Sequence, residues 1–496
     1  MKKRTLILVH PPQQGLLEGF SSGLISLANF VAAKESSIEV RLLDLGMISL
    51  SALESAIKTL ITDISGDLFV GITTTTASYQ SALKVARAFK RLSDKIVVVL
   101  GGYHASTQDD VILRHHYPSV DLVIRGEGEI ALLELVRQYP DLSMVPGLSY
   151  LDGNAIRRNP SAPFLVQEEL DCLPPMFCGQ GLRSAPGKFD HVTYVSARGC
   201  RLECAFCSVG NQDFRAKSIS SVIADLRILV GEYGYRRIAI EDNFFTHSPR
   251  RTLDLCAALE ELQQDLSFTW DCQTRIESMH RLDIVEAMER GGCEAAYLGV
   301  EAFEPKQLIY LRKTPSPDSY LTMLEHQVVP QLLASRIDCY LNLQLGLPGE
   351  QQLQRDSTLL QLQRLGQKAR GCGKGITIFP QLHVIYPGTQ HFHEALQENR
   401  FGPDGIDIFE DFTRWESQQE PVLRWLGEHF AHGTGGIPVG ILSSDRLHLG
   451  KFVIDSDAIL RIVNQLEQIE NIPGITIFKY SHYLTKMDET LSSGSE

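Results

Sequence analysis

Apolar runs alternate with amphipathic segments along most of the chain, and this alternation predicts two α/β domains. In the first 140 residues, five short runs rich in aliphatic residues have the length and composition of buried strands. These runs are residues 5–9, 39–43, 68–72, 96–100 and 122–124. Amphipathic segments such as residues 78–92 separate them and predict helices. Strands that alternate with helices in this way favour a parallel, doubly wound, Rossmann-like sheet.

From residue 191 onward the same alternation repeats about six times. The strands predicted there are residues 192–196, 237–240, 268–272, 295–299, 338–344 and 377–385. Six strand-helix units in succession predict a partial (βα)6 barrel of the TIM type. Residues 141–188 lack helical periodicity and contain Pro146-Gly147 and Asp152-Gly153, so we expect a linker with a small hairpin around residues 148–156.

The chain therefore divides into four parts: domain 1–140, linker 141–188, barrel 189–400 and C-terminal region 401–496. The last part contains an acidic stretch at 404–411, a glycine cluster at 432–436, a predicted helix at 457–469 and a predicted strand at 475–480. Two interpretations of this small α/β region stay open. It is either a lid that shapes a substrate site or a cap that covers apolar barrel surface.

Composition narrows the range of partners. The 496 residues are 43% hydrophobic and carry a net charge of −13, so no basic face for nucleic acid or anionic lipid is expected. No apolar run reaches the 18 or so residues that a membrane helix needs. The basic start of the chain resembles a signal peptide, but its apolar run ends at His10-Pro11, which favours a buried first strand. A small-molecule or peptide substrate is the partner we expect.

Three of the ten cysteines form the pattern C-x-x-x-C-x-x-C at Cys200, Cys204 and Cys207. Cysteine thiolates are soft, anionic ligands that suit iron–sulfur clusters, and three of them leave one iron of a four-iron cluster open to bind a substrate. A structural zinc site is the alternative, but it needs a fourth ligand, and no second C-x-x-C is present. A disulfide is a weaker alternative. Unpaired cysteines beside an oxygen-sensitive cluster imply a reducing compartment, and we expect the cytoplasm.

Together with Phe206, this segment resembles the cluster-binding loop of the radical SAM enzymes. The resemblance implies that the open iron binds S-adenosylmethionine (SAM). It also implies that the reduced 4Fe-4S cluster cleaves SAM to methionine and a deoxyadenosyl radical, which abstracts hydrogen from a substrate. An electron donor such as flavodoxin or ferredoxin is implied as well.

Residues that follow the barrel strands match the radical SAM pattern, and chemistry in β/α barrels collects at those strand ends. The resemblance implies that Glu241, Asp242 and Asn243 hold the SAM amino group and that Arg275 lies near its carboxylate. It places Glu301 at the ribose, Gln344 and Gly346 in the adenine and ribose loop, and Phe206 among the SAM contacts. The alternatives are helix caps for Asp242 and Glu301 and a surface ion pair for Arg275.

Small, polar loops follow the strands of the first domain, where doubly wound sheets bind their ligands. Their order resembles the cobalamin-binding domain that precedes the barrel in one class of radical SAM enzymes. The residues that this resemblance assigns to cobalamin are Thr73, Thr74, Thr75, Ser78, Gly101, Gly102, His104, Gly126, Glu127, Gly128 and Glu129. The D-x-H-x-x-G motif that supplies an axial histidine in other cobalamin proteins is absent. We therefore expect His104 to orient a loop or contact the nucleotide tail rather than bind cobalt.

Taken together, the resemblances imply a cobalamin-dependent radical SAM methyltransferase that moves a methyl group from SAM, through methylcobalamin, to an unactivated carbon. One alternative keeps both cofactors but catalyses a rearrangement or cyclisation without methyl transfer. A further alternative is a non-catalytic protein that senses corrinoid or redox state. The mass of the product distinguishes the first two, and the absence of SAM cleavage would favour the third.

Overall fold

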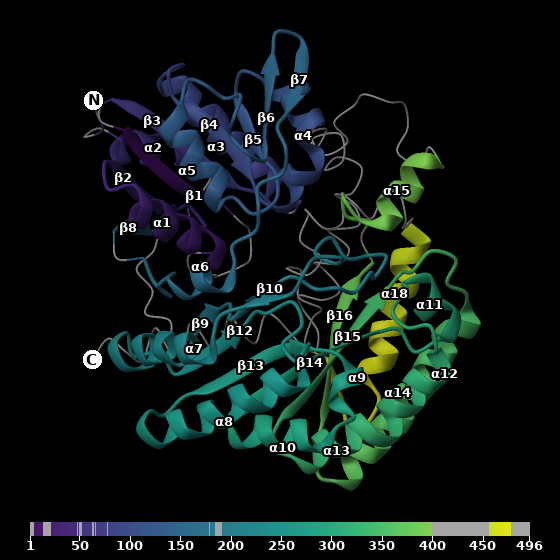
Figure 1. Cartoon of the computed structure of the whole chain (residues 1–496). Coiled ribbons are helices and arrows are strands. Elements are labelled where there is room, and N and C mark those ends of the chain that lie inside the picture. The colour runs from purple at the N-terminus through teal and green to yellow at the C-terminus, as the bar shows by residue number, and fades with distance from the viewer. Residues whose placement is uncertain are drawn as a thin grey trace. The chain divides into compact units, whose positions relative to one another are not determined.

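The computed structural model describes residues 4–12, 21–46, 48, 52–61, 64, 66–76, 78–177, 179–183, 191–383, 385–398 and 456–477. The chain forms two compact units (Figure 1). One comprises residues 1–189 and 392–413, and the other comprises residues 190–391 and 414–496.

The first unit is built on an eight-stranded sheet in the order β7-β6-β5-β4-β3-β1-β2-β8. Its strands are β1 (Arg4–His10), β2 (Ile38–Asp44), β3 (Asp67–Thr73), β4 (Val97–Gly101), β5 (Leu122–Ile124), β6 (Leu148–Asp152), β7 (Ala155–Arg158) and β8 (Gln180–Arg183). Its helices are α1 (Ser22–Lys34), α2 (Leu53–Leu60), α3 (Tyr79–Leu92), α4 (Tyr103–His116), α5 (Glu129–Gln138) and α6 (Gln167–Asp171). The five predicted strands and the helix expected at 78–92 are all present.

Alternation of side chains along β1 explains why this sheet has a core on each face. Leu6 and Leu8 pack with residues of α1 and α5 in one core, whereas Ile7 and Val9 pack with residues of α2 and α3 in the other. Successive side chains of a strand point to opposite faces, so a strand covered on both sides is apolar throughout. The order 2-1-3-4-5 of the first five strands is that of a doubly wound sheet.

The segment expected to be a linker contributes three strands to this sheet. The predicted hairpin is present as β6 and β7, but it pairs antiparallel with β5 and so extends the sheet. Farther along, β8 pairs in parallel with β2 at the other end. Both additions are possible because the edge strands of a sheet have unpaired backbone groups that can bind a further strand. Asp109 of α4 holds the hairpin in place by accepting hydrogen bonds from Arg158 and Ser149.

The second unit contains a seven-stranded parallel sheet in the order β17-β16-β15-β14-β13-β12-β9. Its strands are β9 (His191–Tyr194), β12 (Arg237–Ile240), β13 (Thr269–Thr274), β14 (Cys293–Glu301), β15 (Asp338–Leu345), β16 (Ile376–Leu382) and β17 (Ile475–Ile477). Its helices and π-helical segments are α7 (Ile219–Leu226), η1 (Arg227–Glu232), α8 (Pro249–Asp265), α9 (Ile276–Met279), α10 (Leu282–Arg290), α11 (Pro305–Tyr310), α12 (Pro317–Met323), η2 (Leu324–Val328), α13 (Val329–Ala334), α14 (Gln352–Gly371) and α18 (Ser456–Glu470). After the sixth of these strands the chain forms α15 (Gln390–Gln397).

Six strands of this partial barrel match the prediction, and the seventh comes from the C-terminal region. The predicted helix and strand of that region are present as α18 and β17, and β17 pairs in parallel with β16 through Ile376 and Ile475. This part of the C-terminal region therefore completes the sheet instead of only covering it, because the edge of β16 would otherwise stay open. The stretches 404–411 and 432–436 lie outside the described residues.

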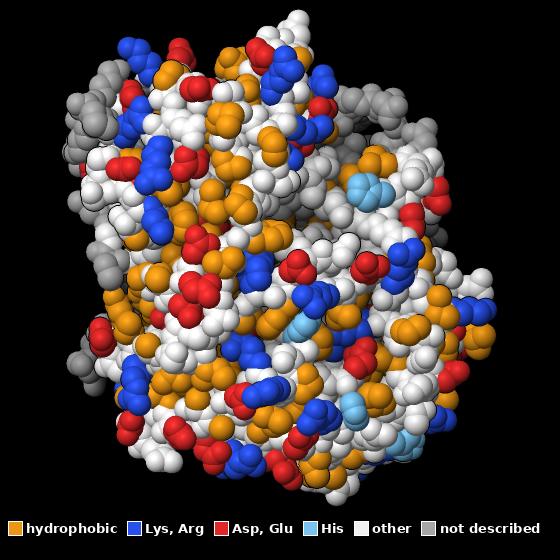
Figure 2. All heavy atoms as spheres, in the orientation of Figure 1, with side chains coloured by type: hydrophobic (Ala, Val, Ile, Leu, Met, Phe, Trp, Pro, Cys, Tyr) orange, Lys and Arg blue, Asp and Glu red, His pale blue; other side chains and the backbone are white. Residues whose placement is uncertain are grey.

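Among the described helices, none is long and apolar enough to cross a membrane. On the face of the molecule that Figure 2 displays, Lys and Arg side chains are interspersed with Asp and Glu.

Candidate functional site

A short hairpin presents the three cysteines directly after the first barrel strand. Strand β10 (Ala197–Arg198) pairs antiparallel with β11 (Arg215–Ala216), so residues 199–214 form the connecting loop. The carbonyl of Cys200 accepts a hydrogen bond from the N–H of Gln212 at 2.8 Å. The loop is also held to the chain after α11 by a 3.0 Å hydrogen bond from the N–H of Ala205 to the carbonyl of Leu311.

All three thiols are free, with Cys200 buried and Cys204 and Cys207 half-buried. Burial, and then the neighbouring sulfurs of Cys204 and Cys200, raise the pKa of Cys207, so the three thiols lie within electrostatic range of one another. Within the described residues, no group of three or more Cys, His, Asp or Glu side chains is arranged to hold a single metal ion. A four-iron cubane instead binds each cysteine through a different iron, so its ligands need not converge on one point. Three free thiols in one loop therefore fit a cluster as a donor set.

Asp242, which follows β12, fixes the backbone that leads into this loop. Its Oδ1 accepts from the N–H groups of Ser196 and Ala197 at 2.7 and 2.8 Å, and its Oδ2 accepts from Ser196 Oγ at 2.6 Å. The residue is buried, and burial raises the pKa of its carboxyl. Arg251 adds a 3.2 Å hydrogen bond to Ser196 Oγ. The sequence suggested a SAM ligand or a helix cap here, whereas the structure uses both carboxylate oxygens to hold the loop.

Arg275, which follows β13, places its guanidinium against one of the cysteines. Its Nη1 lies 3.3 Å from Cys204 Sγ. Its Nη2 donates to Glu277 Oε1 and to the carbonyl of Lys313, both at 2.6 Å, and its Nε donates to Glu277 Oε2. Burial opposes the charged form, but the hydrogen bonds from Arg275 to Glu277 outweigh it and raise the pKa of the guanidinium. With a side chain that is 10% exposed, Arg275 is not the surface ion pair that the sequence left open.

Glu301, at the end of β14, belongs to a buried polar chain across three strand ends. Its Oε1 lies 3.1 Å from Lys313 Nζ, and its Oε2 accepts from Gln344 Nε2 at 3.1 Å. Gln344 Oε1 in turn lies 2.7 Å from Nδ1 of His383, the first residue after β16. Glu301 has a φ of 72°, a left-handed backbone conformation that costs a non-glycine residue about 1–3 kcal/mol. Strained residues of this kind concentrate at functional sites.

The other residues assigned to SAM follow β12 or β15 or lie in the cysteine loop. Glu241 and Asn243 are exposed, Phe206 is half-buried inside the cysteine loop, and Gly346 has a φ of 73°. Sequence reasoning did not find Ser196, Arg251, Lys313 or His383. The available signal was their position, because Ser196 and His383 lie at or near the carboxyl ends of the predicted strands 192–196 and 377–385.

In the first unit, Thr74 joins the loops that follow β3 and β4. Its backbone N–H and its Oγ1 both donate to the carbonyl of Gly101 at 2.7 Å, and its Oγ1 accepts from the N–H of Ala105. The side chain is completely buried, so its hydroxyl holds the loops together instead of facing a ligand. A side chain at Gly102 would place its Cβ 2.5 Å from the carbonyl oxygen of Thr74, and the φ of 93° also demands glycine.

Other predicted cobalamin residues differ in how accessible they are. Ser78 is buried and shares hydrogen bonds with the exposed Thr75, while Thr73 and Glu127 are half-buried. His104 is buried against Tyr79, with its Nδ1 3.2 Å from Thr76 Oγ1, a position that orients the loop.

Gly126 leaves the backbone of the loop after β5 open. It is exposed, and a Cβ there would meet nothing within 4 Å. The buried Glu129, by contrast, accepts a 2.7 Å hydrogen bond from Ser26 of α1, and Gly128 lets Leu27 approach. These last two residues serve helix packing, and the open backbone near Gly126 suits the close approach of a ligand.

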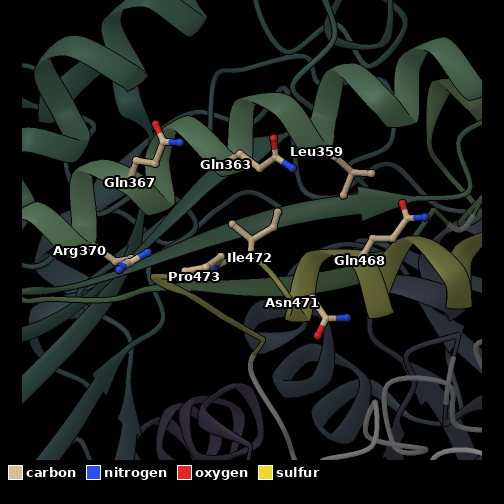
Figure 3. A pocket seen from close by; sticks show the side chains of 8 residues that line it. All are labelled: Leu359, Gln363, Gln367, Arg370, Gln468, Asn471, Ile472 and Pro473. Carbon is tan, nitrogen blue, oxygen red and sulfur yellow. The ribbon is translucent and has the colours of Figure 1, made fainter.

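A separate cleft of about 500 Å³ lies between α14 and the end of α18 (Figure 3). The residues that line it are Leu359, Gln363, Gln367, Arg370, Gln468, Asn471, Ile472 and Pro473. Pro473 precedes β17, so the cleft lies near the amino ends of the strands, away from the cysteines. Its lining is mostly amide and apolar, without a thiol or a carboxylate.

Known proteins match this chain over both of its units. The B12 binding domain family matches residues 17–136. An uncharacterized methyltransferase of Pyrococcus horikoshii, PH0819, is 30% identical over 333 residues, which cover 64% of this chain and 70% of the relative. The anaerobic magnesium-protoporphyrin IX monomethyl ester cyclase of Rubrivivax gelatinosus is 26% identical, over 52% of this chain and 48% of the cyclase.

Among solved structures, the radical S-adenosylmethionine methyltransferase TsrM of Kitasatospora setae, with cobalamin and a [4Fe-4S] cluster bound, has the same fold. The TM-score is 0.65 at 16% identity, and the match covers 81% of this chain and 76% of TsrM. The chain belongs to the radical SAM enzymes with an amino-terminal cobalamin-binding domain, the class of the cobalamin-dependent radical SAM methyltransferases.

Proposed function

We propose that this enzyme transfers a methyl group from SAM to an unactivated carbon of a small molecule or peptide. The observation that carries the proposal is the loop of three free cysteines at the carboxyl edge of the barrel, with Arg275 against one of its sulfurs. The same chain carries a match to the B12 binding domain, so both cofactors of such a reaction have a candidate site.

We assign Cys200, Cys204 and Cys207 as the ligands of a 4Fe-4S cluster. When bound, the cluster supplies the electron that cleaves SAM, and cobalamin carries the methyl group that is transferred. Asp242 keeps the entry to the loop in one conformation through its bonds to Ser196 and Ala197. Its role in the proposal is therefore to position the loop, which replaces the direct contact with SAM suggested by the sequence.

For SAM itself, we assign the polar groups that surround the cysteine loop. Each oxygen of Glu301 accepts one hydrogen bond and keeps lone-pair capacity for a ribose hydroxyl. Glu241 and Asn243 are exposed next to the loop and offer acceptors to an ammonium group. Phe206, Gln344 and Gly346 complete the set, and Arg275 has a second Nη1 hydrogen for the SAM carboxylate.

For cobalamin, we assign the accessible loop residues Thr73, Thr75, Gly101, Gly102, Gly126 and Glu127 as contacts. Thr74, Ser78 and His104 are buried and hold the shape of the same loops. The open backbone of Gly126 supports close approach of a large ligand.

Cyclisation without methyl transfer is the second candidate, because a relative that matches half of the chain is a cyclase. A reducing, cytoplasmic location and a flavodoxin or ferredoxin donor belong to the same proposal. All nine cysteines among the described residues are free, which supports a reducing compartment.

The test uses full-length enzyme reconstituted anaerobically with iron, sulfide and hydroxocobalamin, then given SAM labelled in its methyl group, a reductant and a cell extract as substrate source. Labelled product together with deoxyadenosine supports methyl transfer. Deoxyadenosine with an unlabelled product supports cyclisation. If neither deoxyadenosine nor labelled product forms, the catalytic proposal is wrong.

Cysteine variants separate cluster chemistry from damage to the fold. Cys200→Ala, Cys204→Ala and Cys207→Ala should each lose iron and deoxyadenosine formation. Cys372→Ser changes an exposed cysteine at the end of α14 and should retain both.

A further inference from the structure

The buried polar chain at the barrel strand ends finishes in a histidine, His383, to which the sequence gave no role. Its backbone N–H donates to the carbonyl of Leu345 at 2.8 Å and so continues the pairing of β15 with β16 by one residue. The residue is 1% exposed. Its Nε2 is buried and has no hydrogen-bond partner in the part of the chain that the structure describes. His383 is therefore held in place by its backbone and by the hydrogen bond of Nδ1 to Gln344.

The carboxylate of Glu301 determines the direction of every hydrogen bond in this chain. A carboxylate only accepts hydrogen bonds, so Gln344 has to turn its amide nitrogen toward Glu301 Oε2, at 3.1 Å. The amide oxygen of Gln344 then faces His383, and Nδ1 of His383 carries the proton that is donated across 2.7 Å. Burial, with a contribution from His391, lowers the pKa of His383 to about 3, so the ring is neutral at physiological pH.

This hydrogen bond opposes rotation of the Gln344 amide. A carboxamide that turns by half a turn exchanges its donor and its acceptor, and the oxygen of Gln344 would then face the carboxylate of Glu301. His383 donates to that oxygen and keeps it on the other side. Glu301 consequently has one fixed donor at each oxygen, Gln344 at Oε2 and Lys313 at Oε1.

The ring of His383 is itself positioned by residues that contact the cysteine loop. It lies edge-on to the ring of His391, with centroids 5.2 Å apart and planes at 70°. His391 stacks on Tyr310 at 4.2 Å, and its backbone N–H donates to the carbonyl of Ala205, between Cys204 and Cys207, at 3.2 Å. The orientation of His383 is thus tied to the loop that carries the cysteines.

We propose that His383 is a positioning residue for SAM, which fixes the amide of Gln344 and thereby prepares Glu301 to accept hydrogen bonds from the ribose hydroxyls. This inference rests on the SAM site proposed above. Because Nε2 is enclosed, His383 acts on SAM only through Gln344. Side chains that hold a binding group in one geometry increase affinity for the part of the ligand that this group contacts. The contribution of His383 should therefore concern the ribose and leave the adenine and methionine parts of SAM unaffected.

The test measures binding of SAM and of its 2′-deoxy and 3′-deoxy analogues by anaerobic equilibrium dialysis. It uses the full chain with its iron–sulfur cluster reconstituted and without a reductant. A hydrogen bond to a charged group is strong, so wild type should bind at least one analogue about 10-fold more weakly than SAM. His383→Leu removes the donor and should weaken binding of SAM by about 5-fold, with little change for that analogue. The preference for the ribose hydroxyl should shrink accordingly.

Two further variants separate the lost donor from a change of shape. His383→Asn has nearly the shape of His383→Leu but can donate from its amide nitrogen, so it should restore most of the preference. His326→Leu alters an exposed histidine of the same unit and should bind all three ligands as wild type does. If His383→Leu does not fold or does not hold the cluster, His383→Phe fills the space of the ring without a donor and replaces it.

The outcomes distinguish this inference from the proposed function. Equal losses of affinity for SAM and for the analogue in His383→Leu would indicate a general structural effect and overturn the proposal. An Asn variant that binds like the Leu variant would overturn it as well. Binding of SAM by wild type without preference for either hydroxyl overturns this inference and leaves the SAM site standing. If wild type binds no SAM, the site itself is wrong and the inference falls with it.

Discussion

Replacing Asp242 tests whether the candidate cluster loop depends on a single buried carboxylate. Asp242→Ala removes the acceptor of two buried backbone N–H groups, those of Ser196 and Ala197, and the partner of Ser196 Oγ. A buried donor left without an acceptor costs about 1–3 kcal/mol, so two of them cost about 2–6 kcal/mol. Removal of a carboxylate whose charge is disfavoured by burial offsets part of this cost, which moves the expected loss toward about 2 kcal/mol.

The hydrogen bonds of Asp242 affect iron binding because they stabilise the loop in the conformation that binds the cluster. A loss of about 2 kcal/mol lowers the population of that conformation, and hence the apparent affinity for the cluster, by roughly 30-fold. Asp242→Asn has the same shape, and its Oδ1 still accepts from both N–H groups, while its amide nitrogen donates to Ser196 Oγ. We therefore expect Asp242→Asn to retain its cluster within a few-fold of wild type.

The assay measures the rate at which an iron chelator removes iron from the reconstituted protein under anaerobic conditions. The loss of cluster absorbance reports this rate. Thermal unfolding of the apoprotein measures the global cost separately. Asp254→Ala is the control, since Asp254 is an exposed aspartate of α8 whose ion pair with Arg250 lies at the surface. Cluster retention by Asp242→Ala equal to that of wild type would show that the loop keeps its shape without the carboxylate, and the reasoning would be refuted.

Burial, with a further contribution from Glu294, raises the pKa of Asp271 from 3.8 to about 7, so its contribution to stability is fully present below pH 4 and is lost as the pH rises through 7. Asp271→Asn should therefore be more stable than wild type at pH 8, by up to about 4 kcal/mol at 1.4 kcal/mol per pH unit. Urea unfolding of both proteins at pH 5 and pH 8 measures the difference in stability. The same difference at the two pH values would contradict the prediction. Gly102→Ala should destabilise the first unit by more than about 2 kcal/mol, because its Cβ would clash with Thr74. The Cβ of Gly126→Ala meets open space, so only the backbone strain of about 1 kcal/mol is expected. Equal melting temperatures for the two variants would disprove this difference. Arg275→Gln removes a cation 3.3 Å from Cys204, so the reduction potential of the cluster should fall, by about 59 mV for each tenfold change in the one-electron equilibrium. Arg275→Lys should recover part of the shift. An unchanged potential in spectroelectrochemistry would exclude an effect of Arg275 on the cluster potential.

The sequence by itself determined the elements of this protein and the identity of its most reactive groups. Burial on both faces makes a parallel strand apolar along its whole length, so β1 to β5 and the six strands from β9 to β16 were legible as local patterns. The spacing of Cys200, Cys204 and Cys207 was equally local, because one short loop carries all three residues. Loops that follow parallel strands share one edge of the sheet, which is why residues such as Arg275 and Glu301 could be placed near the cysteines.

Only the tertiary structure decided what each polar side chain contacts. Asp242 and Ser196 are 46 residues apart, Arg275 and Cys204 are 71 apart, and His383 and Gln344 are 39 apart. No periodicity links such pairs, since their contact depends on which strand ends the topology brings together and on the register between strands. The same reason applies to β17, whose place beside β16 required the end of the chain to return to the sheet edge. A hydrogen bond forms over about 3 Å and in one direction, so it is specified by the folded positions of both partners and not by the residue types alone.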